Sequence, residues 1–309
     1  MNGRIKPVAV GTLNEEYLIR FLKHIRKMDL SPKTKYAYDQ SISRCIDLLS
    51  KGRMTTDPTK IGTKEIIYLK DVAMSQLTTK TKIYYLSFFN TYLEYYNNRA
   101  LSNMHIHWPS DSRTNVDWLE PSQARELLAA PLTLGQQLVI RLELCMGLRR
   151  VEVIRLTVDR IHSDRVEVRG KGRAGGKWRT VPMTGDTKDI LDRYLDFRSR
   201  QIAQYRETNP GAEVPKEVFL HTKCGMLLPY SEHGVGFDKR FVIPVREKMG
   251  MKYGNHTLRR TFGRQLWKSK VPIETISKIL GHESISVTLL YIGVNNDDMS
   301  KAVRDLSFD

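Results

Sequence analysis

The sequence predicts a mainly α-helical protein with a small β-hairpin, which is an α+β fold. Apolar residues recur every three or four positions through most of the chain, the spacing of amphipathic helices. Two short runs, 165–168 and 178–182, flank a turn rich in glycine and lysine, which is typical of two antiparallel strands joined by a hairpin turn. The 309 residues are enough for about two domains.

Helices fill the N-terminal part. Residues 13–28 carry apolar side chains at helical spacing. Ser31 followed by Pro32 indicates an N-cap with proline at the first helical position, so a second helix is predicted from there to near Gly52. Residues 79–97 form an aromatic-rich amphipathic helix. Its rings either stack on nucleic-acid bases or pack in a core, and we favour the core.

A change of pattern marks a boundary between two domains. Residues 100–116 lose helical periodicity and hold Pro109 with several small polar side chains, so we expect an interdomain linker, bounded at 106–116. A helical domain over 1–105 precedes it and a second domain over 117–309 follows. The second domain is predicted to contain helices at 135–146, 149–156, 186–206, 232–250, 257–269, 272–280 and 284–292, and a tail helix near 297–306.

The charge of the chain indicates its partner. Lysine and arginine number 50 and aspartate and glutamate 34, which gives a net charge of +16. Such a surplus favours a polyanionic partner, most simply nucleic acid. From charge alone, the alternative is a basic protein whose charge serves solubility.

Composition also excludes several classes of protein. No stretch approaches the roughly 18 apolar residues of a membrane span, and the first residues lack the apolar core of a signal peptide, so we expect a cytoplasmic protein without a membrane partner. Cys45, Cys145 and Cys224 lie far apart and form no CxxC pair. Neither a disulfide framework nor a zinc finger is therefore indicated.

Two segments of the second domain carry polar residues at a helix start and in the hairpin turn. Arg149 begins a helix, where backbone N–H groups favour an anion and the guanidinium adds a planar fork for phosphate oxygens. The alternative is a surface arginine between two helices. Lys171 and Lys177 lie in the turn, where a lysine either reaches into a groove as a proton donor or is simply solvated.

Two further segments carry histidine, arginine and tyrosine. His256 and Arg259 are three residues apart and share a helix face, while Arg260 is expected to point toward DNA or the surface. His282 follows a glycine that ends a helix, and Tyr291 lies near the end of the next one. Taken singly, the His–Arg pair is compatible with a structural role, and the tyrosine with core packing.

In their order and spacing, the segments GLRRVE, GKG before a TVPM strand, HTLRRTF and LGHESISVTLLY resemble the recurrent boxes of the tyrosine recombinase family of phage integrases and Xer-like recombinases. The resemblance covers residues 118–300. The N-terminal part, with its Ser-Pro-x-Thr helix start, is similar to the helical SAM-like core-binding domain of that family. The resemblance therefore implies a DNA-binding core-binding domain followed by a tyrosine recombinase catalytic domain.

The resemblance assigns three residues to the DNA phosphate and one acid to their support. Arg149 and Arg259 are implied to bind the nonbridging oxygens of the scissile phosphate, and His282 to add a hydrogen bond to it. Glu152 corresponds to an acid that supports the site without reacting. Arg150 departs from the family, because an aliphatic residue usually stands at that position.

The resemblance assigns three residues to the covalent step. Tyr291 is implied to attack the phosphate and leave a 3′-phosphotyrosyl link, with His256 handling its proton. Lys171 is implied to protonate the departing 5′ oxygen. The turn is longer than usual and holds a second lysine, so Lys177 remains the alternative.

This residue set also suits the chemistry on physical grounds. Phosphoryl transfer gathers negative charge on the phosphate oxygens, and preorganised cations stabilise that charge, so no metal or other cofactor is expected. A tyrosine has an ordinary pKa of about 10, and nearby cations and a base such as His256 are expected to favour its phenolate. A covalent phosphotyrosine retains the energy of the broken bond, which favours strand exchange without ATP over hydrolysis.

The predicted function is a site-specific DNA recombinase that integrates, excises or resolves DNA. The expected partners are double-stranded DNA and further copies of the chain, as a dimer on one site and a tetramer in synapsis, with residues 295–309 docking on a neighbouring protomer. Two alternatives remain: a type IB topoisomerase-like relaxing enzyme, and a non-catalytic DNA-binding protein of the same fold.

Overall fold

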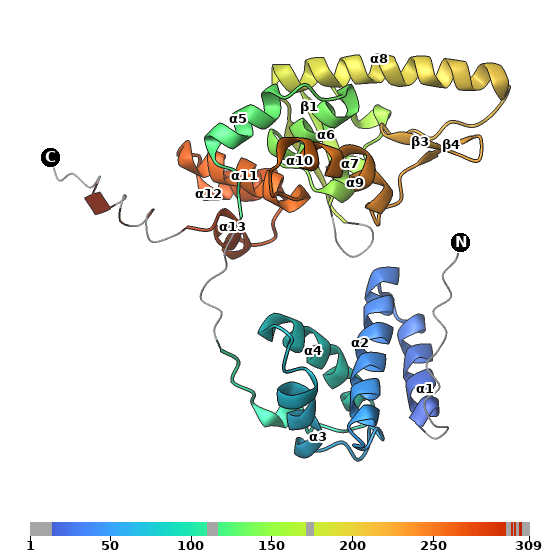
Figure 1. Cartoon of the computed structure of the whole chain (residues 1–309), viewed down its shortest axis with the longest axis vertical. Helices are drawn as coiled ribbons and strands as arrows, with labels where there is room; N and C mark the ends of the chain where they lie inside the picture. The colour runs from blue at the N-terminus through green and yellow to red at the C-terminus, as the bar shows by residue number, and fades with distance from the viewer. Residues whose placement is uncertain are drawn as a thin grey trace. The chain divides into compact units, whose positions relative to one another are not determined.

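The computed structural model describes residues 14–109, 117–170 and 176–294, with 298, 300, 303 and 304. The chain divides into two compact units, Met1–Ser112 and Arg113–Asp309. The described residues are mostly helical and contain two antiparallel two-stranded sheets, which confirms the α+β prediction (Figure 1). Across those residues, every helix is too short or too polar to cross a membrane.

The first unit is a helical domain. Ser31 caps its second helix, because the hydroxyl accepts a hydrogen bond from the Thr34 amide at 3.1 Å, as predicted. The rings of Phe89 and Tyr92 are fully buried, which confirms core packing for most of the aromatic helix, although Tyr84 is 48% exposed. The elements are α1 (Asn14–Lys27), α2 (Pro32–Lys51), α3 (Thr63–Ile67), a π-helical turn (Tyr68–Ala73), α4 (Thr79–Tyr95) and a short 3₁₀ turn (Ser102–Met104).

The region of the predicted linker is ordered at its start. Ile106 and Trp108 pack against the core of the first unit. The described part of the stretch thus extends that unit, and residues 110–116 lie outside the described residues.

The second unit contains the predicted hairpin, in which Arg165 pairs with Pro182 and Arg169 with Trp178. Its elements, coloured from green to red in Figure 1, are α5 (Pro121–Ala129), α6 (Leu134–Leu144), α7 (Arg150–Ile154), a 3₁₀ turn (Val158–Arg160), β1 (Arg165–Arg169), β2 (Trp178–Pro182), α8 (Gly185–Thr208), β3 (Leu220–Lys223), β4 (Met226–Pro229), α9 (Val235–Phe241), α10 (Ile243–Met249), α11 (Asn255–Lys268), α12 (Ile273–Leu280) and α13 (Ile285–Ile292).

Two predictions for this unit differ from the structure. A single helix over 232–250 is wrong, because α9 ends at Phe241 and α10 begins at Ile243, with Pro244 in its first turn. The β3–β4 hairpin has no counterpart in the prediction. Most of the tail helix expected near 297–306 lies outside the described residues.

Helix α6 lies at the centre of the second unit and packs against α8, α9 and α11. Its apolar residues Leu138, Val139, Ile140 and Leu142 are fully buried. Glu143 on the same helix is also buried, and burial, reinforced by the charge of Asp238, raises its pKa well above the ordinary value.

Gly147 ends the turn after α6 and brings α7 against α11. Its φ is +64°, a conformation that glycine adopts without strain. A Cβ at this position would lie 2.4 Å from Cδ1 of Phe262 on α11. Only a glycine therefore allows this close approach, which places the start of α7, and with it Arg149, beside α11.

Candidate active site

Glu152 on α7 organises the centre of the site. Its side chain is fully buried. Oε2 accepts a hydrogen bond from the Arg149 amide at 2.7 Å, and Oε1 accepts one from Arg149 Nη1 at 2.9 Å. Arg179 on β2 donates to the same carboxylate through Nη1 at 2.6 Å and Nη2 at 2.9 Å. The carboxylate thus orients one arginine of α7 and one of the hairpin.

The protonation state of Glu152 follows from these contacts. Burial alone would raise the pKa of the carboxyl, but the hydrogen bonds and charge of Arg179, together with the Arg149 amide, lower it below the ordinary value. Glu152 is therefore ionised at neutral pH and balances part of the surrounding positive charge.

Arg259 on α11 lies behind this pair, with 1% of its surface exposed. Its Nη1 donates to the carbonyl of Gly147 and its Nη2 to the carbonyl of Leu280. Nη1 also lies 3.8 Å from Oε2 of Glu152. Burial and the neighbouring charge of Arg149 lower its pKa to about 10, so the guanidinium stays charged at neutral pH.

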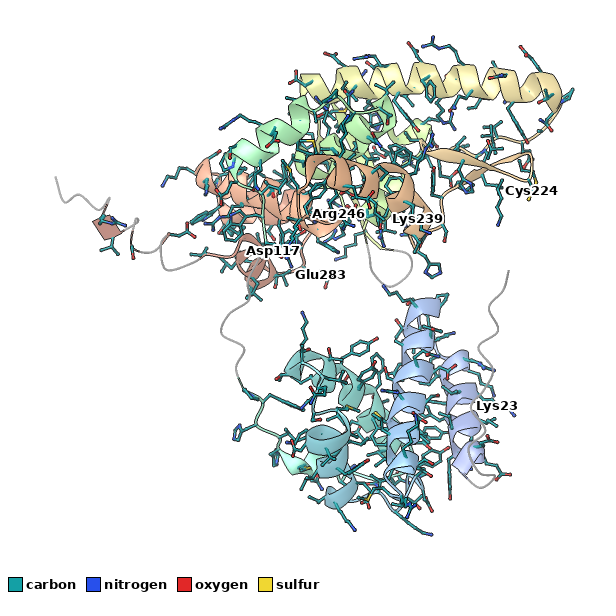
Figure 2. The ribbon with its side chains drawn as sticks, viewed as in Figure 1. Lys23, Asp117, Cys224, Lys239, Arg246 and Glu283 are labelled. Atoms are coloured by element: carbon teal, nitrogen blue, oxygen red, sulfur yellow. The ribbon has the colours of Figure 1, made fainter. Side chains whose placement is uncertain are left out.

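His282 follows the end of α12 and faces Arg259. Gly281 closes the helix with φ +62°, and its carbonyl accepts a hydrogen bond from Arg149 Nη2 at 3.1 Å. The Nε2 atom of His282 lies 3.3 Å from Arg259 Nη2, and Nδ1 lies 2.9 Å from Thr288 Oγ1. Since Arg259 only donates, Nε2 accepts and the proton resides on Nδ1. In Figure 2, Glu283 marks the loop that carries this histidine.

Burial and the charge of Arg259 lower the pKa of His282 to about 4. The unfolded chain, with an ordinary pKa of 6.5, takes up this proton first as the pH falls. We therefore expect the free energy of unfolding to decrease between pH 6.5 and about pH 4. Urea unfolding at pH 7 and pH 5 measures this loss, which should be smaller in His282→Gln.

The matched control for this pH dependence is His233→Gln, because His233 is an exposed residue in a loop. This variant should keep the wild-type pH dependence. An equal loss of stability in the wild type and in His282→Gln would contradict the assignment of the shift to this histidine.

Tyr291 on α13 packs against the histidine and two arginines. Its ring lies 5.0 Å from the ring of His282 in an edge-to-face arrangement. The Cζ atoms of Arg259 and Arg260 lie 5.7 Å and 5.4 Å from the tyrosine ring. The expectation that Arg260 points away from the site is therefore wrong: α13 returns beside α11 and brings the tyrosine ring to it.

The hydroxyl of Tyr291 lies 3.5 Å from the carbonyl of His256, a long hydrogen bond, and also interacts with Arg259. Burial raises the pKa of Tyr291, and the charge of Arg259 opposes this without reversing it. The nearby arginines thus favour the phenolate, as predicted, but burial outweighs their effect on the pKa. His256 is exposed at the first turn of α11, and its backbone carbonyl is the group that lies 3.5 Å from the hydroxyl.

Of the two hairpin lysines, the structure describes only Lys177. Lys171 lies outside the described residues. Lys177 is exposed, and its carbonyl accepts a hydrogen bond from the Gly170 amide at 2.9 Å, which closes the base of the turn. Conversely, Arg179 is a site residue that the sequence did not indicate, since its partner lies 27 residues away.

Comparison with known proteins identifies relatives of the chain. The phage integrase family model matches residues 117–297. Tyrosine recombinase XerD of Listeria innocua is 23% identical over 285 residues, covering 86% of this chain and 89% of that protein. Tyrosine recombinase XerC of Roseiflexus castenholzii is 22% identical over 299 residues, covering 91% and 90%.

Solved structures share the fold. The XerH site-specific recombinase bound to palindromic difH substrate has a TM-score of 0.64 at 16% identity, covering 93% of this chain and 83% of that one. A lambda integrase dimer bound to a COC′ core site has a TM-score of 0.64 at 16% identity, covering 96% and 97%. At these identities the likeness establishes the fold.

Proposed function

Because this chain belongs to the phage integrase family, we propose that Tyr291 attacks a DNA phosphate and forms a 3′-phosphotyrosyl link. The function of the chain is site-specific recombination of DNA. One observation carries the proposal for the site: Arg149, Arg259 and His282 converge beside the tyrosine, although they come from three separate segments.

In the proposed step, Arg149 and Arg259 bind the two nonbridging oxygens of the scissile phosphate and stabilise the charge that grows there. The Oη atom of Tyr291 forms a bond to phosphorus while the bond from phosphorus to the 5′ oxygen breaks. His256 accepts the tyrosine proton, and Lys171 donates a proton to the leaving oxygen. His282 turns its Nε2 atom from Arg259 to the phosphate, which requires that atom to be protonated.

Rejoining reverses this step with a different strand. A 5′ hydroxyl attacks the phosphotyrosine, Lys171 removes its proton, and the tyrosine leaves. Each step replaces one phosphoester bond with another, so the exchange requires no ATP. The same set of cations serves both directions.

We propose that both units bind double-stranded DNA in the cytoplasm. The first unit would serve as a core-binding domain and the second as the catalytic domain, with the chain between them crossing the duplex. The net charge of +16 supports this assignment.

The test of the proposed function is covalent trapping on sheared genomic DNA from the source organism, in the presence of EDTA. Adducts are recovered under denaturing conditions and the attached ends sequenced, with Tyr291→Phe in parallel. Adducts at one recurrent site that disappear in the variant support recombination. Scattered adducts that depend on Tyr291 would instead indicate a topoisomerase-like enzyme, and their complete absence a non-catalytic binder.

The proposal predicts different effects for the two hairpin lysines. Lys171→Ala should slow single-turnover cleavage by about 10²–10³-fold, because the leaving oxygen loses its proton donor, whereas Lys177→Ala should cleave at nearly the wild-type rate. A DNA substrate with sulfur at the 5′ bridging position should restore Lys171→Ala, since a thiol with a pKa of about 8.5 leaves without a proton. The reverse pattern would assign the role to Lys177.

We further propose a dimer on one DNA site and a tetramer in synapsis, joined by the tail at 295–309. One described tail residue, Asp298, pairs with buried Arg264 of the same chain at 2.8 Å. A second copy offers the same arginine, so the tail can exchange between protomers. A chain ending at Val294 should form fewer tetramers on site DNA in gel filtration, and undiminished assembly would refute the exchange.

A further inference from the structure

Arg179 connects three segments of the site through one guanidinium. Only 12% of its side chain is exposed. Its two terminal nitrogens donate to the two oxygens of Glu152 at 2.6 Å and 2.9 Å. Its Nε donates to the carbonyl of Ile279, near the end of α12, at 2.9 Å. The strand β2, the helix α7 and the end of α12 are therefore fixed to one another.

The same side chain also contacts the turn that carries His282. A Cβ built on Gly281 would lie 2.8 Å from Cδ of Arg179, so the arginine packs directly against this glycine. Gly281 and Glu152 are the two groups that accept hydrogen bonds from the Arg149 guanidinium. Arg179 thus touches both partners of Arg149.

The hydrogen bonds of Arg179 are directed at the protein. Each of its three nitrogens donates to a protein acceptor, and the carboxylate it contacts is buried. These contacts therefore support an effect of Arg179 on the reaction through the groups it holds.

We propose that Arg179 is a positioning residue for the recombination reaction: it fixes Glu152 and the end of α12, and thereby sets the geometry of Arg149 and His282 at the phosphate. This inference rests on the proposed function. Arg179 could affect the cleavage step by two routes. One passes through Glu152 to the phosphate-binding arginines, and the other through β2 to the lysine turn. The contacts assign the first.

The test is Arg179→Lys, which keeps the charge but loses the planar fork. We expect single-turnover cleavage to slow by about 10²-fold while the DNA affinity is unchanged. A displacement of a reacting group by about 1 Å has an effect of this size. The acid limb of the pH–rate profile should move to higher pH, because Glu152 loses hydrogen bonds that lower its pKa. The matched control is Arg165→Lys on β1, an exposed arginine that pairs with Asp164.

A substrate with sulfur at the 5′ bridging position separates the two routes. A defect that persists on this substrate supports the route through Glu152, since the leaving group then needs no proton. Restoration of the wild-type rate would overturn it in favour of the lysine turn. A wild-type rate on the ordinary substrate, or a loss of DNA affinity by the same factor as the rate, would also overturn the proposal.

One measurement does not depend on activity. Carbon-13 NMR of the glutamate side chains follows the titration of Glu152 in the wild type and in Arg179→Lys. A higher pKa in the variant supports the positioning contact, and an unchanged pKa overturns it. If the wild type forms no adduct that requires Tyr291, the proposed function fails, while this titration still decides the role of Arg179.

Discussion

Tyr291→Phe should abolish covalent adducts and strand exchange while DNA binding remains at the wild-type level. The substitution removes only the hydroxyl, which makes a long hydrogen bond to the His256 carbonyl at 3.5 Å. The ring keeps its packing against His282 and the two arginines. We expect cleavage to fall by at least about 10⁴-fold, because no other group replaces the nucleophile. Single-turnover cleavage and DNA titration measure the two properties.

The matched control is Tyr205→Phe on α8, which removes a hydroxyl outside the site and should leave both properties unchanged. Residual adducts in Tyr291→Phe would show that a different side chain is the nucleophile. A parallel loss of DNA affinity would show that the hydroxyl serves binding rather than attack.

Arg259→Lys is expected to damage both the chemistry and the fold. Lysine keeps the charge, but its single nitrogen cannot reach the carbonyls of Gly147 and Leu280 in the fork geometry of the guanidinium. Loss of a donor aimed at the transition state should slow cleavage by about 10²–10³-fold. A buried carbonyl left without its charged donor should lower the free energy of unfolding by about 2 kcal/mol. Single-turnover cleavage and urea unfolding measure these effects.

Arg155→Lys provides the control for Arg259→Lys. Arg155 makes an equally two-pronged pair with Glu232, at 2.5 Å and 2.6 Å, but its side chain is 37% exposed. Water replaces such contacts, so the loss of stability should stay below about 1 kcal/mol. If both variants lost the same stability, burial of Arg259 would not be the cause of its importance.

Local sequence signals predicted the helix ends and strands that surround the site. The cap at Ser31, the glycine breaks at Gly147 and Gly281, and the hairpin strands all follow from short-range rules, and the structure contains each of them. The GLRRVE, HTLRRTF and LGH segments further indicated three residues that the fold brings together, Arg149, Arg259 and His282.

Other features depended on contacts that no short window contains. Nothing in the sequence around Arg179 distinguishes it from other strand residues. Only the fold brings its guanidinium to Glu152. The direction of Arg260 depends on the return of α13 beside α11. The raised pKa of Tyr291 results from burial, which the count of nearby cations in the sequence does not include. The break between α9 and α10 follows a single proline.

The hydrogen bonds that build the site join residues far apart in the chain. Arg149 and the carbonyl of Gly281 are 132 positions apart, and Arg259 and that of Gly147 are 112 apart. Closing such long loops costs conformational entropy. The packing of the whole unit supplies the free energy that offsets this cost. During synthesis, the contacts of Arg149 therefore cannot be completed until Gly281 has left the ribosome. A growing chain that ends before Gly281 lacks both this acceptor of Arg149 and Tyr291, so we expect no cleavage of DNA before synthesis of the second unit is nearly complete.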